Sequence, residues 1–172
     1  DHSSELHTAW MNGCGMIIWD NIFGSANLYN ERDRSILRLM APVQRRYHAV
    51  FSWVGWEPFF KISLPGVFAS KWFNNATTLW TLINSANTDR DGLLFSIRHI
   101  SGTKYFNLIT GLETGNVKGD TAYITDSIRS RGIGCILAVK KEGITLEFKQ
   151  FLQRQQVVYS KYNSNMGSVF PN

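Results

Sequence analysis

Asp20 is the side chain of this sequence best placed for acid–base chemistry, because it follows an apolar run at residues 15–19. Such a run is typical of a strand buried on both faces, as in the parallel sheet of a (β/α) barrel. Barrel enzymes carry their catalytic groups where these strands end, so a carboxyl group at this point is a catalytic candidate. The alternative is that Asp20 makes a structural hydrogen bond or lines a pocket without reacting.

The neighbours of Asp20 could bind a ligand rather than react with it. Trp19 and Phe23 offer flat aromatic faces on which a sugar ring could stack, and Asn21 offers an amide that can both donate and accept hydrogen bonds. The alternative for the two rings is packing against the wall of a barrel. We therefore treat Trp19, Asn21 and Phe23 as candidate substrate-binding residues.

The elements that would hold these residues are two helices with a strand between them. We predict the end of a helix over residues 6–12, closed by Gly13, and then the strand over 15–19. A loop over 22–29 leads to a helix that Asn30 caps and whose apolar face recurs at helical spacing over residues 36–51. Pro42 lies within this helix and should kink it near Arg38 or split it.

This order of elements is too short for a complete barrel. Residues 1–56 are therefore predicted to be the last strand and helix of a (β/α)8 barrel. The apolar surfaces of this segment should then lie against polypeptide that is not part of this sequence.

After residue 56 the apolar period changes to two, which predicts an antiparallel β-sandwich over residues 57–142. Trp72 and Trp80 lie on two strands that should form a hairpin, where they are either an exposed, substrate-binding stacking pair or part of the core. The predicted strands of the sandwich are 67–73, 78–84, 93–98, 105–109, 121–125 and 134–139.

Residues 143–172 are predicted as a terminal segment that begins with a strand over 144–148. This strand should continue as a helix or linker to residue 159 and end in a linker-like tail. The fold class is therefore mixed α and β, with a final barrel unit followed by an antiparallel sandwich.

Composition argues against several functional classes. The chain has 172 residues and a formal charge of +5, but its arginines cluster on one predicted helix without a basic stripe of interleaved aromatics, so nucleic-acid binding is not indicated. No apolar run is long enough to span a bilayer, which takes about 18 residues or more. The four histidines lack the spacing of a metal site, and no phosphate loop or dinucleotide fingerprint is present, so neither a metal nor a cofactor is expected. Cys14 and Cys135 are both predicted to be small buried apolar residues.

Several stretches resemble a group of bacterial glycoside-hydrolase-like proteins. The sequence GMIIWDNIFG at 15–24, with 32–38 and 42–46, is similar to the last barrel strand and helix of that group. Residues 65–72, 79–84, 105–111 and 131–139 are similar to strands of the β-sandwich that follows the barrel. Some members continue into a domain like the formylglycine-generating sulfatase-modifying enzymes. This chain has Asp20 where the group more often has Glu, and Asn107 where it more often has Asp.

The resemblance implies a carbohydrate-active protein whose sandwich is a non-catalytic accessory domain. Glycoside hydrolysis normally needs two carboxyl groups at a fixed separation. No second carboxyl group is placed to act with Asp20, so its catalytic partner would lie outside this sequence. The alternative is a free-standing sandwich module that binds carbohydrate or another protein.

The expected partners are accordingly a carbohydrate ligand and the remainder of the parent polypeptide, with no cofactor, nucleic acid or membrane. A carbohydrate-active protein would be found in a secreted or periplasmic location more readily than in the cytoplasm.

Overall fold

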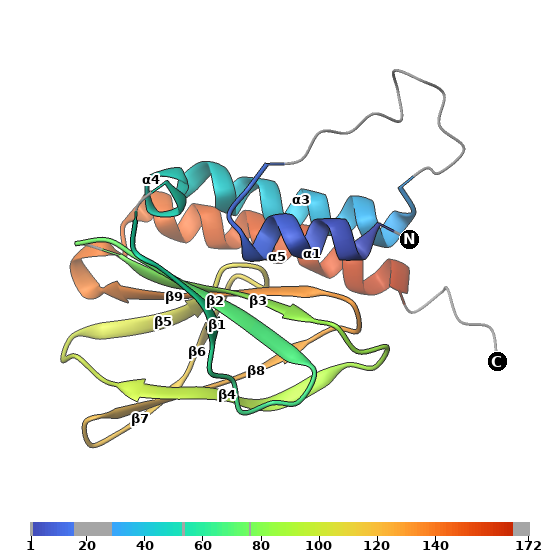
Figure 1. The fold of residues 1–172 in the computed structure, drawn as a ribbon. Helices are drawn as coiled ribbons and strands as arrows, with labels where there is room; N and C mark the ends of the chain where they lie inside the picture. Colours follow the sequence, from blue (N-terminus) through green and yellow to red (C-terminus); the bar gives the residue numbers. More distant parts are fainter. Residues whose placement is uncertain (1, 16–28, 53, 76, 167–172) are drawn as a thin grey trace.

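The protein has a mixed α/β fold with two antiparallel sheets, the larger of which is covered by helices that include a long C-terminal helix. The computed structural model describes residues 2–15, 29–52, 54–75 and 77–166. Helices cover one face of a six-stranded sheet, and a three-stranded sheet covers the other face (Figure 1). The coarse prediction of a mixed α and β fold with antiparallel sheets is confirmed.

The larger sheet has the strand order β1-β2-β3-β9-β5-β6, and the smaller sheet has the order β4-β8-β7. Neighbouring strands pair antiparallel in both sheets. The bounds of the strands are β1 Trp56–Phe60, β2 Val67–Phe73, β3 Thr78–Asn84, β4 Arg90–Arg98, β5 Thr103–Asn107, β6 Leu112–Thr114, β7 Asn116–Lys118, β8 Thr121–Ile128 and β9 Ile133–Lys140.

The two faces of the larger sheet bury different side chains, because successive residues of a strand point to opposite faces. Trp80 and Leu82 of β3 point towards the smaller sheet and pack against Phe95 of β4. Leu79 of the same strand points towards the helices. The sheet therefore separates two apolar cores.

The helices form a single layer over the larger sheet. They are α1 (Ser3–Met11), α3 (Glu31–Arg46), the short α4 (His48–Phe51) and α5 (Leu146–Met166), with a 3-10 turn η1 (Lys141–Gly143) before α5. The predicted strand over 144–148 is wrong, because residues from Leu146 onward belong to α5. Phe148, Phe151 and Leu152 of α5 enter the core beneath the helices at helical spacing.

The ends of α1 and α3 follow the predicted capping residues. Gly13 has a φ of +62°, which suits glycine, and its N–H and that of Cys14 donate to the carbonyls of Trp10 and Ala9. The Asn30 side chain accepts a hydrogen bond from the N–H of Asp33 at 2.9 Å. Both caps therefore form as their residue types predict.

Pro42 does not split its helix near Arg38, because α3 continues to Arg46. The break comes instead at Tyr47, which separates α3 from α4. A proline removes one backbone hydrogen bond, and the burial of the preceding Met40 and the following Val43 holds the helix together across this gap.

The described part of residues 1–56 covers its own apolar side chains. Leu6 and Trp10 of α1 are fully buried, and Ile36 and Leu39 of α3 are 1% exposed, in the same core as α5 and the larger sheet. The expectation that these apolar surfaces need polypeptide beyond this sequence is therefore wrong for the described helices. Gly15 has no regular structure, and the rest of the predicted 15–19 strand lies outside the described residues.

The predicted division at residues 56 and 142 remains a prediction. Side chains from all three predicted segments meet in the core beneath the helices, as Trp10, Leu137 and Phe148 show. Across the described ranges, no helix is long and apolar enough to cross a bilayer.

Candidate functional site: an aromatic groove beside the edge strand

The active site predicted from the sequence belongs to a segment outside the described residues. Asp20, the catalytic candidate, and Trp19, Asn21 and Phe23, its candidate binding neighbours, lie outside the described residues.

Trp72 and Trp80 do not form the exposed stacking pair considered above. They are 3% and 2% exposed, and they belong to the two different cores on opposite faces of the sheet. Their positions on paired strands are offset by one residue, because Trp80 lies opposite Lys71 rather than Trp72. An offset of one residue turns a side chain to the other face, so both tryptophans are core residues.

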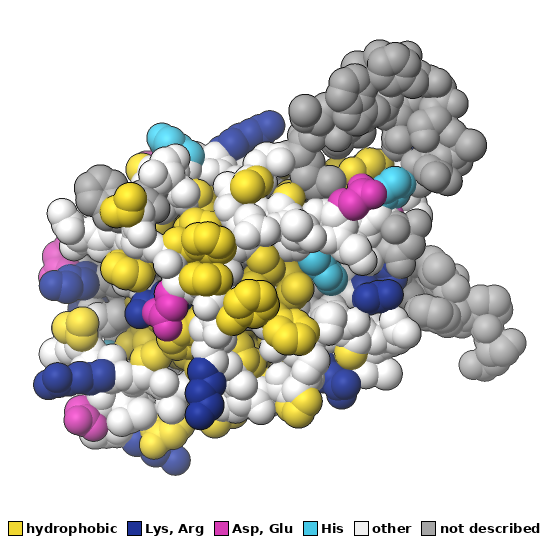
Figure 2. Space-filling model, viewed as in Figure 1, with side chains coloured by type: hydrophobic (Ala, Val, Ile, Leu, Met, Phe, Trp, Pro, Cys, Tyr) yellow, Lys and Arg dark blue, Asp and Glu magenta, His cyan; other side chains and the backbone are white. Residues whose placement is uncertain are grey.

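A groove runs beside the edge strand β1, between that strand, β2 and helix α1. We call it the aromatic groove, because Trp56, Phe59 and Phe68 supply its apolar surface, while Thr8 and Asn12 of α1 border it. Its volume is about 430 Å³, within the size range of small-ligand sites, about 300–1,000 Å³. Figure 2 shows hydrophobic side chains gathered on this face of the molecule, below α1 and over β1 and β2.

Trp56 is a rigid surface within the groove. The residue is 42% exposed, and its ring stacks on Trp72 with a centroid separation of 5.5 Å and an interplanar angle of 18°. Trp72 is itself fixed, because its indole N–H donates to Thr81 Oγ1 at 3.0 Å and its ring meets the edge of Phe51 at 5.2 Å. A ring held in this way loses little conformational freedom when a ligand stacks on it.

Phe59 is held in an unusual backbone conformation. Its φ is +53°, in the left-handed region, and it lies in an irregular part of β1 where the pairing register with β2 shifts after Glu57. Its side chain is nevertheless 80% exposed, so burial of the ring does not compensate for the strain. A strained residue that presents a large aromatic ring to solvent is a candidate for a functional role.

Gly55 fixes the start of this edge strand. The N–H of Phe73 donates to the carbonyl of Gly55 at 2.8 Å, and a Cβ at residue 55 would collide with the carbonyl oxygen of Phe73. β1 therefore lies close against β2 before its irregular part turns Phe59 outward.

His7 and Arg131 supply polar groups at the far side of the groove. Nε2 of His7 lies 2.9 Å from the carbonyl oxygen of Arg131. Because a carbonyl oxygen only accepts hydrogen bonds, Nε2 carries the proton. Burial lowers the pKa of His7 below its ordinary value of 6.5, which favours the neutral ring with Nδ1 as an acceptor. The Arg131 guanidinium donates to the carbonyl of Ser85 at 3.2 Å, which holds it at the groove.

The lining of the groove offers surfaces that could bind a neutral ligand. Among its described lining residues there is no carboxyl group. No group of three or more acidic, histidine or cysteine side chains that could hold a metal occurs in the described ranges either. Aromatic surfaces with hydroxyl, amide and guanidinium groups at their border suit an uncharged ligand that has both apolar faces and hydroxyl groups.

Sequence reasoning missed Trp56, Phe59 and Phe68 as site residues. The available signal was the segment Trp56–Phe60, in which a proline lies among large aromatic residues. A proline within such a run indicates an edge strand, and an edge strand exposes one side of its residues.

Comparison with solved structures gives similarities that include a glycoside hydrolase. The chain is similar to a GH30 endoxylanase from Clostridium papyrosolvens C71, with a TM-score of 0.40 and 14% sequence identity over 80% of this chain. The match covers 36% of the endoxylanase chain. No family model and no curated protein matches the sequence.

Proposed function

We propose that the aromatic groove binds a neutral oligosaccharide and that this chain is a non-catalytic carbohydrate-binding part of a glycoside-hydrolase-like protein. The observation that carries the proposal is the pair of presented rings. Trp56 is backed by Trp72, and Phe59 faces solvent from a strained backbone. Both rings border the same groove as the amide of Asn12 and the guanidinium of Arg131.

This arrangement matches the two kinds of surface on a sugar. The C–H groups on one face of a pyranose ring are apolar and pack on aromatic rings, and the hydroxyl groups around its edge need hydrogen-bonding partners. Trp56 and Phe59 would supply the apolar contact, and Asn12 and Arg131 would supply hydrogen bonds from the border. Because no carboxyl group lines the groove, the proposed role is binding rather than hydrolysis.

The finer assignment of residues 1–56 to the last strand and helix of a (β/α) barrel is also a proposal. It is supported by the order of α1, the segment 16–28 and α3, in which two helices flank the apolar run. The sequence that flanks this segment in its genome tests the assignment. We expect upstream βα units, and their absence would refute it.

The binding proposal is tested by titrating the chain with neutral xylo-, cello- and manno-oligosaccharides in a calorimeter. We expect at least one series to bind, and Trp56→Ala to weaken that binding by about tenfold or more, the loss typical of a central aromatic contact. The matched control is Tyr123→Ala, because Tyr123 is 38% exposed but lies on β8 of the smaller sheet. Absence of binding in every series, or equal losses in the two variants, would refute the proposal.

A further inference from the structure

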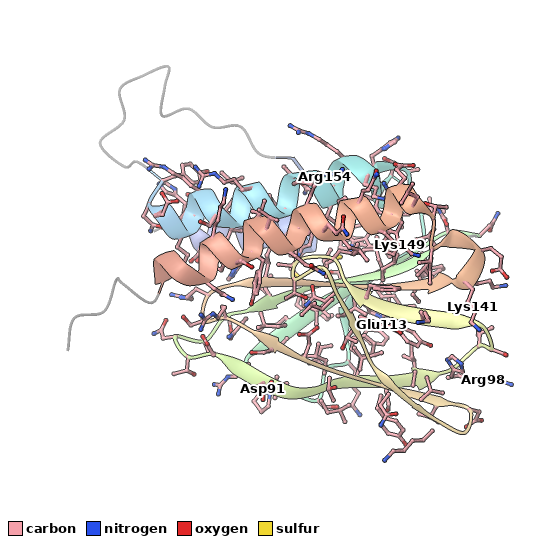
Figure 3. The ribbon with its side chains drawn as sticks, turned by 180° about the vertical axis from the view of Figure 1, so that it is seen from behind. Asp91, Arg98, Glu113, Lys141, Lys149 and Arg154 are labelled. Carbon is pink, nitrogen blue, oxygen red and sulfur yellow. The ribbon has the colours of Figure 1, made fainter. Side chains whose placement is uncertain are left out.

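A second cavity opens between the two sheets at the end where β4 and β9 finish. We call it the cationic mouth, and it is lined by Lys71, Arg98, Lys140, Thr103, Tyr105 and Trp80 among others. Its volume is about 460 Å³, again within the range of small-ligand sites, about 300–1,000 Å³. Figure 3 shows Arg98 at the same end of the molecule as Lys141, which directly follows β9.

The pairing register explains why residues from four strands of the larger sheet meet at this mouth. Lys71 of β2 lies opposite Trp80 of β3, and Thr103 of β5 lies opposite Lys140 of β9. Residues directly opposite each other share a face of the sheet, here the face towards the smaller sheet. Arg98 comes from the last position of β4 on the facing sheet.

The charges that line the mouth are all of one sign. Its described lining residues include three cations and no carboxyl group. Lys71 forms an ion pair at 3.2 Å with Glu57, its partner on β1. Neither Arg98 nor Lys140 has an ion-pair partner anywhere in the described ranges. Two unpaired cations on a cavity whose lining has no carboxyl group favour an anionic ligand.

Trp80, one of the lining residues of the mouth, carries an unpaired hydrogen-bond donor. The indole N–H of Trp80 is buried and has no hydrogen-bond partner in the described structure, although the side chain is 2% exposed. Tyr105 contributes a hydroxyl that lies 3.2 Å from Nδ1 of His99. Buried donors are nearly always paired, so an unpaired one in the wall of a cavity indicates where a ligand oxygen could bind.

We propose that the cationic mouth binds an acidic oligosaccharide through a sugar carboxylate. Arg98 and Lys140 would bind the carboxylate, and the hydroxyl and amide side chains of the lining would bind the sugar hydroxyls. A simple anion would leave those neutral hydrogen-bonding groups without a role. The assignment to carbohydrate rests on the proposed function, whereas the preference for an anion rests on the mouth alone.

The test is calorimetric titration with a hexamer of galacturonic acid and with its fully methyl-esterified form, which has the same chain but no charge. We expect the acid to bind at least about tenfold more tightly than the ester. Binding of the acid should also weaken as NaCl is raised from about 0.05 to about 0.5 M, because salt screens exposed charges. Equal binding of acid and ester, or no binding of the acid, would overturn the proposal.

Variants distinguish this site from its surroundings and from the aromatic groove. Arg98→Gln and Lys140→Gln should each weaken binding of the acid by about tenfold. Lys141→Gln, which removes a neighbouring cation outside the lining, should change it by less than about twofold. Trp56→Ala should leave binding of the acidic oligosaccharide intact. A failure of the proposal for the aromatic groove and a failure of the proposal for the cationic mouth therefore give different results. Equal losses in Arg98→Gln and Lys141→Gln, or sodium sulfate competing as well as the oligosaccharide, would contradict a built sugar site.

Discussion

Replacing Phe59 by glycine separates the stability of this protein from its proposed binding function. At a φ of +53° a non-glycine residue is strained by about 1–2 kcal/mol, and glycine removes that strain. Glycine also increases the freedom of the unfolded chain, which offsets about 0.5–1 kcal/mol of the gain. Phe59 is 80% exposed, so removing its ring forfeits little burial. The expected result is a free energy of unfolding that rises by about 0.5–1 kcal/mol.

Phe59→Ala is the matched control, because alanine loses the ring but keeps the strained φ. Its free energy of unfolding should stay within about 0.5 kcal/mol of that of the wild type. Thermal unfolding followed by circular dichroism measures the difference, which for a chain of this size corresponds to a rise in Tm of about 1–4 °C for the glycine variant. Both variants should lose binding of the neutral oligosaccharide in calorimetry. A glycine variant less stable than the alanine variant would contradict the backbone strain at residue 59. Unchanged oligosaccharide binding in either variant would show that the ring of Phe59 has no part in binding.

Two further predictions concern the titratable groups of α1 and the sheet. Burial lowers the pKa of His7 below 6.5 in the folded protein. As the pH falls, the His7 ring therefore binds a proton in the unfolded chain before it does so in the folded one, and the free energy of unfolding decreases below about pH 6.5. Urea unfolding at several pH values should show a smaller decrease in His7→Gln than in the control His48→Gln, which removes an exposed histidine. An equal dependence of stability on pH in the two variants would contradict the assignment of this effect to His7. Cys14 is exposed, whereas burial raises the pKa of the Cys135 thiol, so a thiol reagent should modify one cysteine in the folded protein and both after unfolding. Modification of folded Cys14→Ser would contradict this burial.

The hairpin β2–β3 was predictable from the sequence to the residue. Val67–Phe73 and Thr78–Asn84 have a period of two and are separated by a short polar turn, and the strands begin and end where predicted. Both signals are local, so they act without help from the rest of the fold. The capping residues Asn30 and Gly13 were identified for the same reason.

The C-terminal helix shows where local signals are ambiguous. Leu146 and Phe148 alternate with polar residues as in a strand, but Phe148, Phe151 and Leu152 also fit a helix. One face of the larger sheet must be covered, and α5 packs beside α3 to cover it. Packing against the sheet and α3 decided between the strand and the helix, both of which the segment itself allows.

The cysteines and tryptophans show a similar limit. Cys14 was expected to be buried, but it lies beyond the C-terminal cap of α1 and is exposed, whereas Cys135 within β9 is buried as expected. Trp72 and Trp80 were correctly placed on paired strands, but their register turns them to opposite faces. Register depends on partners across the sheet, which neither residue specifies.

The amino-acid sequence by itself determined the period-two strands, the hairpin, the helix caps and the mixed α/β class, because each depends on neighbours within a few residues. The tertiary structure alone decided that Phe59 is turned into solvent and that Lys71, Arg98 and Lys140 meet at one mouth. These features require strands distant in the sequence to pair and two sheets to stack. Such long-range contacts form only when the whole chain buries its two cores together.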